Sequence, residues 1–179
     1  MPELPEVNSY QKYFDASARG KLIREVGVQD DYIIKDLDGS AFRKKLQGQT
    51  FTGSYRRGKY LFGELNNGHH LLLHFGMSGD LKLYNEPEEA PKHERFHFTF
   101  EGGERLGFDC PRKFARIRYI EDLEAYLQDK KLGPDALNEL DWDTFRDTRQ
   151  GKKSTVKGFL LNQRYLAGVG NLYADEICY

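Results

Sequence analysis

The stretch between Thr50 and Ile120 constrains the fold more than any other part of this sequence. It contains short apolar or alternating segments separated by turn-forming residues, as in Asn66-Asn67-Gly68 and Glu101-Gly102-Gly103. Asn and Gly tolerate the positive φ that tight hairpin turns require. The expected strands, including one before this stretch, are residues 22–28, 50–57, 60–65, 69–75, 81–84, 96–100, 105–109 and 114–120. Many short strands at this spacing predict a β-sandwich or barrel.

Helical patterns flank the β region on both sides. An amphipathic first helix, ending near Gly20, is predicted by apolar residues at helical spacing: Leu4, Val7, Tyr10, Phe14 and Ala18. A short helix capped by Ser40 is expected to run through Leu46 and to stop at Gly48. Further helices are expected at residues 122–130 and 142–148, after Ser154 or Thr155, and from Asn171. The fold class is therefore α+β, with a helical second part after the strands.

The charge is nearly balanced, at −1 over 179 residues, which by itself does not indicate nucleic acid. The charges are uneven, however, with basic clusters at residues 56–59, 112–118 and 152–157 and an acidic segment at 121–147. A basic face and an acidic back, or ordinary solvated charges, both fit this pattern. The two cysteines predict neither a disulfide framework nor a zinc site. No signal peptide or membrane span is expected.

The first seven residues, Met-Pro-Glu-Leu-Pro-Glu-Val, allow two interpretations. Removal of Met1 would leave Pro2 with a free secondary amine, which can attack a sugar C1′ centre and form an iminium ion. That fixed charge acidifies the neighbouring carbon and favours elimination, and Glu3 could move the protons. In the alternative interpretation, the prolines and glutamates simply begin a helix, where Pro and acidic residues are favoured.

Three later motifs bear on this choice: Arg57-Gly58-Lys59-Tyr60-Leu61, His74-Phe75-Gly76-Met77-Ser78-Gly79 and Ala167-Gly168-Val169-Gly170-Asn171-Leu172-Tyr173. Together with the N-terminal motif, and in this order, they resemble the formamidopyrimidine-DNA glycosylase / endonuclease VIII family of DNA repair enzymes. Pro111-Arg112-Lys113-Phe114 is similar to the formamidopyrimidine-DNA glycosylase branch. The resemblance covers nearly the whole chain. It implies an N-terminal helix on a two-sheet β-sandwich, followed by the start of a helix-two-turn-helix domain.

The resemblance implies domain limits and catalytic residues. The expected parts are a catalytic domain at residues 1–130, a linker at 131–150 and the incomplete DNA-binding domain at 151–179. Pro2 would be the nucleophile, Glu3 the acid and base, and Lys59 a hairpin lysine that holds phosphate beside the lesion. Glu6 would support them, although a helix-start role fits it equally.

DNA contacts are implied in the same way. His74 and Asn171 match family residues that contact the DNA backbone, and Lys157 matches a lysine near the site. Met77, Arg112 and Phe114 match residues that fill the void left by an everted base. A core position for His74, Met77 or Phe114, and a surface position for Lys157, are the alternatives. Further candidates for phosphate contacts are Arg56, Arg57, Lys113 and Arg116.

The function implied is a bifunctional DNA glycosylase and abasic-site lyase that removes oxidised purines and cleaves the strand by β,δ-elimination. Its partner would be double-stranded DNA with damaged bases or abasic sites, and we expect a cytoplasmic, nucleoid-associated monomer. No cofactor or metal is expected, because the family's usual C-terminal zinc finger does not appear in these 179 residues. We expect a chain truncated within the helical domain. The alternative function is a non-catalytic module that binds damaged DNA.

Overall fold

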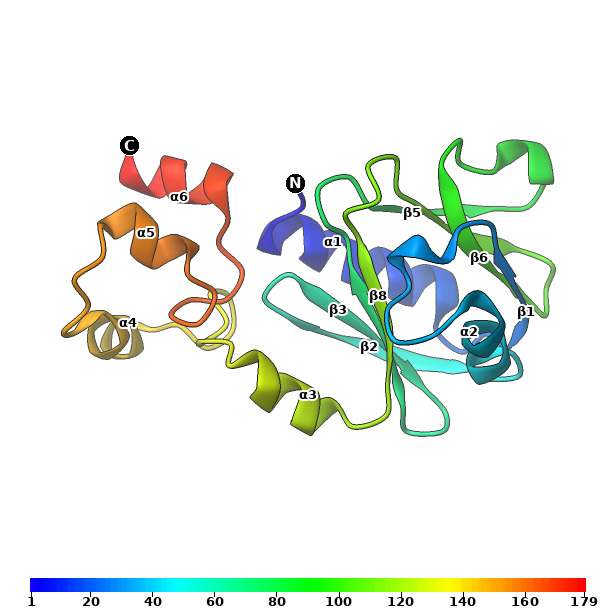
Figure 1. Ribbon diagram of the computed structural model, residues 1–179, viewed down its shortest axis with the longest axis horizontal. Coiled ribbons are helices and arrows are strands. Elements are labelled where there is room, and N and C mark those ends of the chain that lie inside the picture. Colours follow the sequence, from blue (N-terminus) through cyan, green and yellow to red (C-terminus); the bar gives the residue numbers. More distant parts are fainter.

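The computed structural model describes residues 1–179 and contains two four-stranded sheets that enclose one hydrophobic core (Figure 1). The first sheet has the order β1 (Ile23–Val28), β6 (Glu94–Phe100), β7 (Arg105–Asp109) and β5 (Asp80–Tyr84). The second has the order β2 (Phe51–Arg57), β3 (Tyr60–Leu65), β4 (His70–His74) and β8 (Arg116–Ile120). Every strand pair is antiparallel. The predicted two-sheet β-sandwich is confirmed.

The core between the sheets is aromatic because alternate residues of the strands point inward. Phe96, Phe98 and Phe100 of β6 are all buried, as their period-2 spacing predicts. The Phe96 ring stacks on Phe108 of β7 with a centroid distance of 5.2 Å. The turn at Gly68, with φ +82°, connects β3 to β4 as the sequence indicates. Stacked and edge-to-face aromatic pairs therefore join neighbouring strands in the core.

The first helix, α1 (Leu4–Ala18), packs against β2 and β3 of one sheet and β5 of the other. It buries Val7, Phe14 and Ala18 in the core, which the helical spacing predicts. At its start, the Glu6 carboxylate accepts a hydrogen bond from the Glu3 N–H at 2.9 Å. This bond satisfies one of the backbone donors that a helix N-terminus leaves free. The N-terminus consequently lies at the junction of the β-sandwich with the later helices (Figure 1).

Three local expectations differ from the structure. Helix α2 (Gly39–Leu46) is capped by Asp38, whose carboxylate accepts from the Ala41 N–H, and not by Ser40. Two short 3₁₀ helices, at Asp31–Ile33 and Pro87–Glu89, lie in segments where no element was expected. Strand β8 begins at Arg116, so Phe114 lies in the preceding loop. The Phe114 side chain is 55% exposed, because a loop outside the sheet does not bury its residues on the core.

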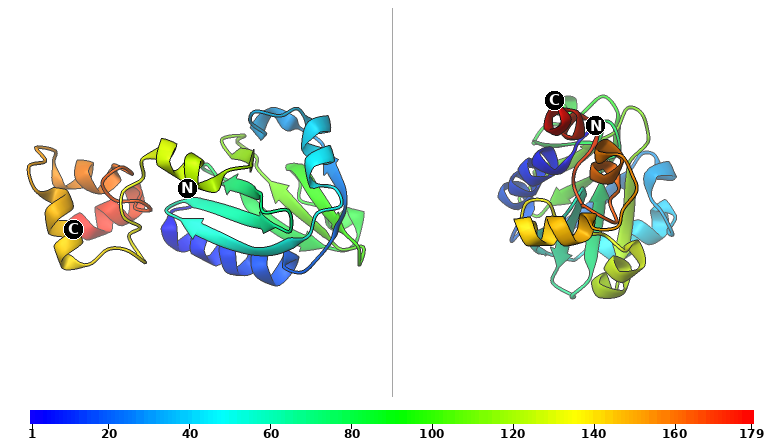
Figure 2. Two further views of the ribbon diagram at one scale, coloured as in Figure 1. Left: turned by 90° about the horizontal axis from the view of Figure 1, so that it is seen from below. Right: turned by 90° about the vertical axis from the view of Figure 1, so that its left-hand side faces the viewer.

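The helices after β8 divide between two packing partners. Helix α3 (Leu123–Lys130) packs against the outer face of the second sheet, over Phe62 and Leu72. Helices α4 (Trp142–Arg149), α5 (Val156–Leu161) and α6 (Asn171–Cys178) share a separate cluster around Phe159 and Leu160. Figure 2 shows this helical part beside the sandwich, so the molecule is elongated.

None of the helices is both long enough and apolar enough to cross a membrane. Cys110 is buried in the sandwich core, Cys178 is exposed on α6, and neither forms a disulfide.

We expect Phe96→Ala to lower the free energy of unfolding by about 3–5 kcal/mol, because the cavity would remove aromatic packing at the centre of the core. Urea unfolding followed by circular dichroism measures this change. The matched control is Trp142→Ala, since Trp142 is 73% exposed and surface substitutions change stability by about 0.5 kcal/mol. Equal losses for the two variants would contradict this description of the core.

Candidate functional site

The carboxylate of Glu3 is buried at the start of α6, although Glu3 lies at the opposite end of the chain. The residue is only 2% exposed. It accepts hydrogen bonds from the backbone N–H groups of Gly170 at 2.7 Å and Leu172 at 2.9 Å, with a longer one from Tyr173 at 3.4 Å. Free N–H groups and the helix dipole make a helix N-terminus favourable for a negative charge. The first turn of α6 therefore fixes the position of Glu3.

Lys59 approaches the same point from the β2–β3 hairpin. A Cβ atom added at Gly170 would lie 2.5 Å from Glu3 Oε1 and 2.7 Å from Lys59 Nζ. Gly170 is thus required where the two charged groups converge. Burial lowers the pKa of the Lys59 ammonium, and the negative charge of Glu3 opposes this shift. The structure brings together Glu3 and Lys59, two residues that the sequence places in separate motifs.

Pro2 precedes this buried carboxylate directly in the chain. It is partly exposed, and Met1 before it is 54% exposed. An exposed N-terminus is accessible to the enzymes that remove an initiator methionine. Close backbone packing holds the segment in place, since the Leu4 N–H donates to the Gly168 carbonyl at 3.1 Å. A Cβ added at Gly168 would lie only 2.4 Å from the Leu4 side chain, and φ at Gly168 is +117°.

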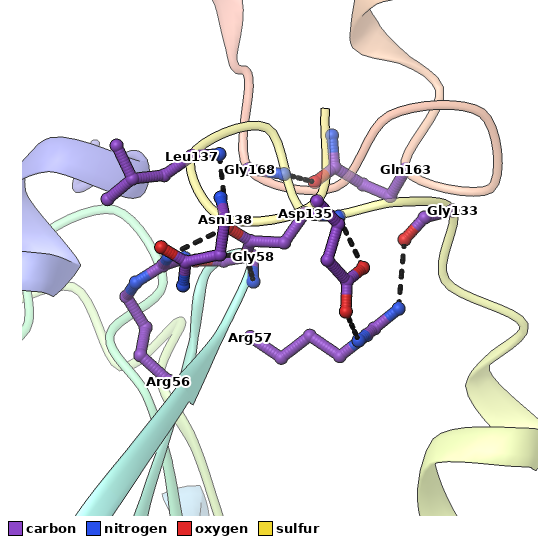
Figure 3. A network of polar contacts seen from close by, with 10 residues as sticks. Arg56, Arg57, Gly58, Gly133, Asp135, Leu137, Asn138, Gln163 and Gly168 are labelled. Atoms are coloured by element: carbon purple, nitrogen blue, oxygen red, sulfur yellow. Dashed lines mark hydrogen bonds and ion pairs between the residues drawn. The ribbon is translucent and has the colours of Figure 1, made fainter. Parts of the chain in front are cut away.

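A polar network joins the Lys59 hairpin to the segment between α3 and α4 (Figure 3). The Arg56 guanidinium donates to both Asp135 carboxylate oxygens, at 2.7 and 2.8 Å, and both side chains are buried. The neighbouring Arg57 pairs with Glu139 at 2.6 Å and donates to the Gly133 carbonyl at 3.3 Å. The expectation that Arg56 contacts phosphate is wrong, because its charge is buried and paired inside the protein. Arg57 is also occupied by an internal ion pair.

His74, at the end of β4, is mostly buried and lies beside Tyr60, with ring centroids 5.2 Å apart. Burial, together with the positive charges of Arg116 and Lys59, lowers its pKa to about 4. The Gly76 N–H donates to Nδ1 at 3.3 Å. The ring is therefore neutral at pH 7 with its proton on Nε2, which makes Nε2 a hydrogen-bond donor.

Met77, Arg112 and Phe114 belong to two loops that touch each other. A Cβ at Gly76 would lie 2.4 Å from the backbone carbonyl of Phe114, and the Arg112 N–H donates to Ser78 Oγ at 3.3 Å. The Arg112 guanidinium lies over the Phe114 ring, 5.6 Å from its centroid. Met77 is 42% exposed and Phe114 55% exposed. Neither side chain is a core residue, so the core interpretation of both is wrong.

The other predicted residues lie on α1, α5, α6 and a loop of the sandwich. Asn171 is the first residue of α6 and is exposed. Lys157 of α5 pairs with Asp175 of α6 at 2.5 Å, which joins the two helices. Glu6 caps α1 and also accepts from the Tyr173 hydroxyl at 3.2 Å, so it has a helix-start role and a contact with α6. Among the other candidates for phosphate contacts, Lys113 pairs with Asp30 at 2.5 Å.

No sequence pattern indicates that Asp135 or Tyr173 belongs to this site. Asp135 follows Gly133-Pro134, a combination that indicates only a turn. Tyr173 lies inside a quoted motif, but nothing in its spacing shows that its N–H and hydroxyl face Glu3 and Glu6. No cluster of three or more His, Cys, Asp or Glu side chains is arranged to hold a metal ion.

Residues 1–117 match the family described as the formamidopyrimidine-DNA glycosylase N-terminal domain. Residues 132–179 match the formamidopyrimidine-DNA glycosylase H2TH domain. A formamidopyrimidine-DNA glycosylase of Listeria monocytogenes is 38% identical over 186 residues, covering all of this chain and 66% of the relative. One from Arabidopsis thaliana is 33% identical over 194 residues, covering all of this chain and 50% of the relative. The chain thus spans between half and two thirds of the length of these relatives.

Solved structures of the Lactococcus lactis formamidopyrimidine-DNA glycosylase have the same fold. One, a complex with DNA containing N7-benzyl-Fapy-dG, has 29% sequence identity and a TM-score of 0.91, covering 99% of this chain and 66% of that protein. Another, bound non-covalently to DNA with an abasic site, has 28% identity and a TM-score of 0.90, covering 99% of this chain and 67% of that protein.

We expect the native His74 ring to titrate near pH 4, as its surroundings require. The pKa of a histidine in the unfolded chain is about 6.5. Between this value and the native pKa of about 4, the unfolded state therefore binds more protons than the native state. His74 consequently lowers stability as pH falls from about 6.5 toward the native pKa. A ¹H–¹⁵N NMR titration measures this pKa and the tautomer. Arg116→Gln should raise it, and a native pKa near the unfolded value would contradict the prediction.

Proposed function

Because the chain belongs to the formamidopyrimidine-DNA glycosylase family, we propose that it acts in DNA repair as a glycosylase that removes oxidised purines from duplex DNA. We also propose that it cleaves the strand at the resulting abasic site. The observation that carries this proposal is the convergence of Glu3 and Lys59 at Gly170. Pro2 directly precedes Glu3 in the chain. Glu3 comes from the N-terminus, Lys59 from a β-hairpin and Gly170 from the start of α6. Glu3 supplies a proton carrier, and Lys59 supplies a cation, beside the Pro2 amine.

The proposed reaction begins when Met1 has been removed and the Pro2 amine is unprotonated. The nitrogen attacks C1′ of the damaged nucleotide, the bond from C1′ to the base breaks, and the base leaves with a proton. The proton that leaves with the base is the one that the Pro2 nitrogen loses, and Glu3, once it has taken up a proton from water, donates it to the sugar ring oxygen as the ring opens to the iminium ion. Loss of a C2′ proton then expels the 3′ phosphate, and a second elimination expels the 5′ phosphate. A secondary amine suits these steps, because its iminium keeps the positive charge that acidifies C2′.

Lys59 and His74 would hold the phosphates beside the everted nucleotide. Lys59 brings a partly desolvated positive charge to the site, and burial strengthens its interaction with an anion. Neutral His74 offers an Nε2 donor to a phosphate oxygen. Asn171 is exposed at the N-terminus of α6, so its side-chain amide can donate to a phosphate beside the backbone N–H groups that bind Glu3. The three residues would bind the strand that contains the lesion.

Met77, Arg112 and Phe114 would occupy the space that the everted nucleotide leaves. Eversion costs a few kcal/mol of unstacking, which insertion of side chains offsets. Exposed Phe114 can stack between bases, flexible Met77 can act as a wedge, and Arg112 can donate hydrogen bonds to the unpaired base opposite. The L. lactis relative was solved with DNA containing a modified base or an abasic site, which supports damaged duplex DNA as the partner here.

We assign these tasks to two parts of the chain. Residues 1–130 would form the catalytic domain, since α3 packs on the outer face of the second sheet. Residues 131–150 would be the connection, and residues 151–179 would begin the DNA-binding domain. The chemistry proposed for Pro2 and Glu3 uses amine and carboxylate groups of the chain and requires no cofactor.

The first test is borohydride trapping on a duplex with an abasic site, with intact-mass analysis of the protein. We expect a covalent adduct linked at Pro2 in protein that lacks Met1. Pro2→Gly should abolish the fixed-charge iminium and slow strand cleavage by a factor on the order of 10²–10⁴, the range typical of a lost catalytic group. Pro5→Ala is the control, because Pro5 is an exposed residue in the first turn of α1 and leaves the terminal amine intact.

Normal cleavage by Pro2→Gly would contradict the assignment of the nucleophile. Folded, Met1-free protein that binds damaged duplex DNA but gives no adduct would favour the alternative function, a non-catalytic binding module.

A second prediction concerns Gly170. The added methyl of Gly170→Ala would lie 2.3 Å from the Glu3 carboxyl carbon and would force Glu3 and Lys59 apart. We expect the trapping rate to fall by a factor on the order of 10². The backbone at Gly170 is extended, so alanine itself causes no strain there. Gly102→Ala is the control, since the same methyl in that exposed turn meets only the Glu104 side chain. A Gly170→Ala variant with full activity would exclude Glu3 at this position from the reaction.

A further inference from the structure

Asp135 accepts an unusual number of hydrogen bonds for one buried carboxylate. Oδ2 accepts from Arg56 Nη1 at 2.7 Å and from the Gly58 N–H at 2.7 Å. Oδ1 accepts from Arg56 Nη2 at 2.8 Å and from the backbone N–H groups of Leu137 at 3.1 Å and Asn138 at 3.2 Å. Figure 3 shows these residues converging on Asp135. Such a carboxylate has little freedom to move, because every displacement breaks a bond to a buried donor.

One side of this carboxylate holds the turn that carries Lys59. Gly58 precedes Lys59, adopts φ +55°, and is bound at its N–H by Asp135 and at its carbonyl by Arg56. A Cβ at Gly58 would lie 3.1 Å from the Ala167 Cβ and 3.3 Å from the Gly168 nitrogen. The turn is therefore packed against Ala167 and Gly168. The Arg56–Asp135 pair fixes the position of the turn relative to these two residues.

The backbone of Asp135 is tied to the loop that holds Glu3. It forms a parallel bridge with Ala167, in which the Ala136 N–H donates to the Ala167 carbonyl and the Ala167 N–H donates to the Pro134 carbonyl. Ala167 leads directly into Gly168 and Gly170, whose backbone contacts Leu4 and Glu3. Gln163 stabilises the same loop by accepting from the Gly168 N–H at 3.0 Å. Asp135 thus stands between the Lys59 turn and the Glu3 loop.

We infer that Asp135, together with Arg56, is a positioning residue that sets the separation between Lys59 and Glu3. The inference rests on the proposed function, because it concerns the same two groups. Neither Asp135 nor Arg56 reaches the reacting atoms, as both are buried within the junction. They act by holding Lys59 and Glu3 in place. Misplacement of such groups by about 1 Å can lower the rate by a factor of about 10².

The test compares single-turnover trapping rates, affinity for an abasic-site duplex and melting temperature in four variants of the full chain. Asp135→Asn leaves the buried Arg56 charge unpaired, so it should lower both stability and rate. Arg56→Met/Asp135→Asn removes that charge together with the pair. We expect this double variant to recover part of the lost melting temperature, since the unpaired charge is gone although the new amide nitrogen cannot accept from a backbone N–H. Its rate should remain lower than that of the unmodified chain by a factor on the order of 10². Its affinity for the duplex should change much less than its rate.

Two controls make the result specific. Arg57→Gln removes the more exposed Arg57–Glu139 pair from the same junction, so it reports on simple loosening of the two parts. It should keep the rate of the unmodified chain. The distant Lys21→Gln, which breaks a pair with Glu104, reports on unrelated ion pairs.

A double variant that regains both stability and rate would show that Asp135 only stabilises the fold, and would overturn the inference. If Arg57→Gln loses as much rate as the Asp135 variants, the inference would also be overturned. Loosening of the junction at any point would then be enough to lower the rate. If the unmodified chain itself forms no adduct, the proposed function fails instead, and the two failures are distinguishable.

Discussion

The buried ion pair between Arg56 and Asp135 determines where the β-sandwich meets the helical part. Burial alone would raise the pKa of Asp135, but the Arg56 guanidinium and the Gly58 N–H outweigh it and hold this pKa below its ordinary value. Taking two charges out of water is expensive, and here the hydrogen bonds that Asp135 accepts and those that Arg56 Nη1 and Nη2 donate offset this cost, although Arg56 Nε has no partner. A pair of this kind specifies one relative placement of its two segments, because no other placement supplies the same partners.

Two glycines allow the close approach of the chain segments that the Arg56–Asp135 pair holds together. At Gly58 a side chain would press on Ala167, and at Gly170 it would displace Glu3 and Lys59. The hairpin, the N-terminus and the start of α6 can therefore share one small volume only because two of the three segments lack a side chain there. Close backbone packing also places the first turn of α6 within hydrogen-bonding distance of Glu3.

The site and the core have opposite electrostatic characters. Aromatic stacking between the sheets involves no charge, and it provides a rigid support for the loops. At the site, burial lowers the pKa values of both Lys59 and His74; neighbouring cations also lower that of His74, whereas Glu3 opposes the shift of Lys59. Desolvation of Lys59 costs free energy, and it also strengthens the interaction of this cation with an anion. Packing of the sandwich core offsets this cost.

The sequence by itself determined the first helix and a β-sandwich or barrel, because alternation, helical spacing and turn residues are local properties of a chain. The motifs around Pro2, Lys59 and Gly170, through their resemblance to a family, indicated the two-sheet sandwich. The sequence also indicated the loop that carries Met77, but it extended strand β8 to include Phe114, which lies in the preceding loop. It could not separate buried arginines from exposed ones, so the expected phosphate contact Arg56 is in fact a buried partner of Asp135. Only the tertiary structure decided that Asp135 binds Arg56 and that the N-terminal Glu3 lies on α6. These contacts join residues 79 and 167 positions apart, and no local pattern encodes partners at such a distance.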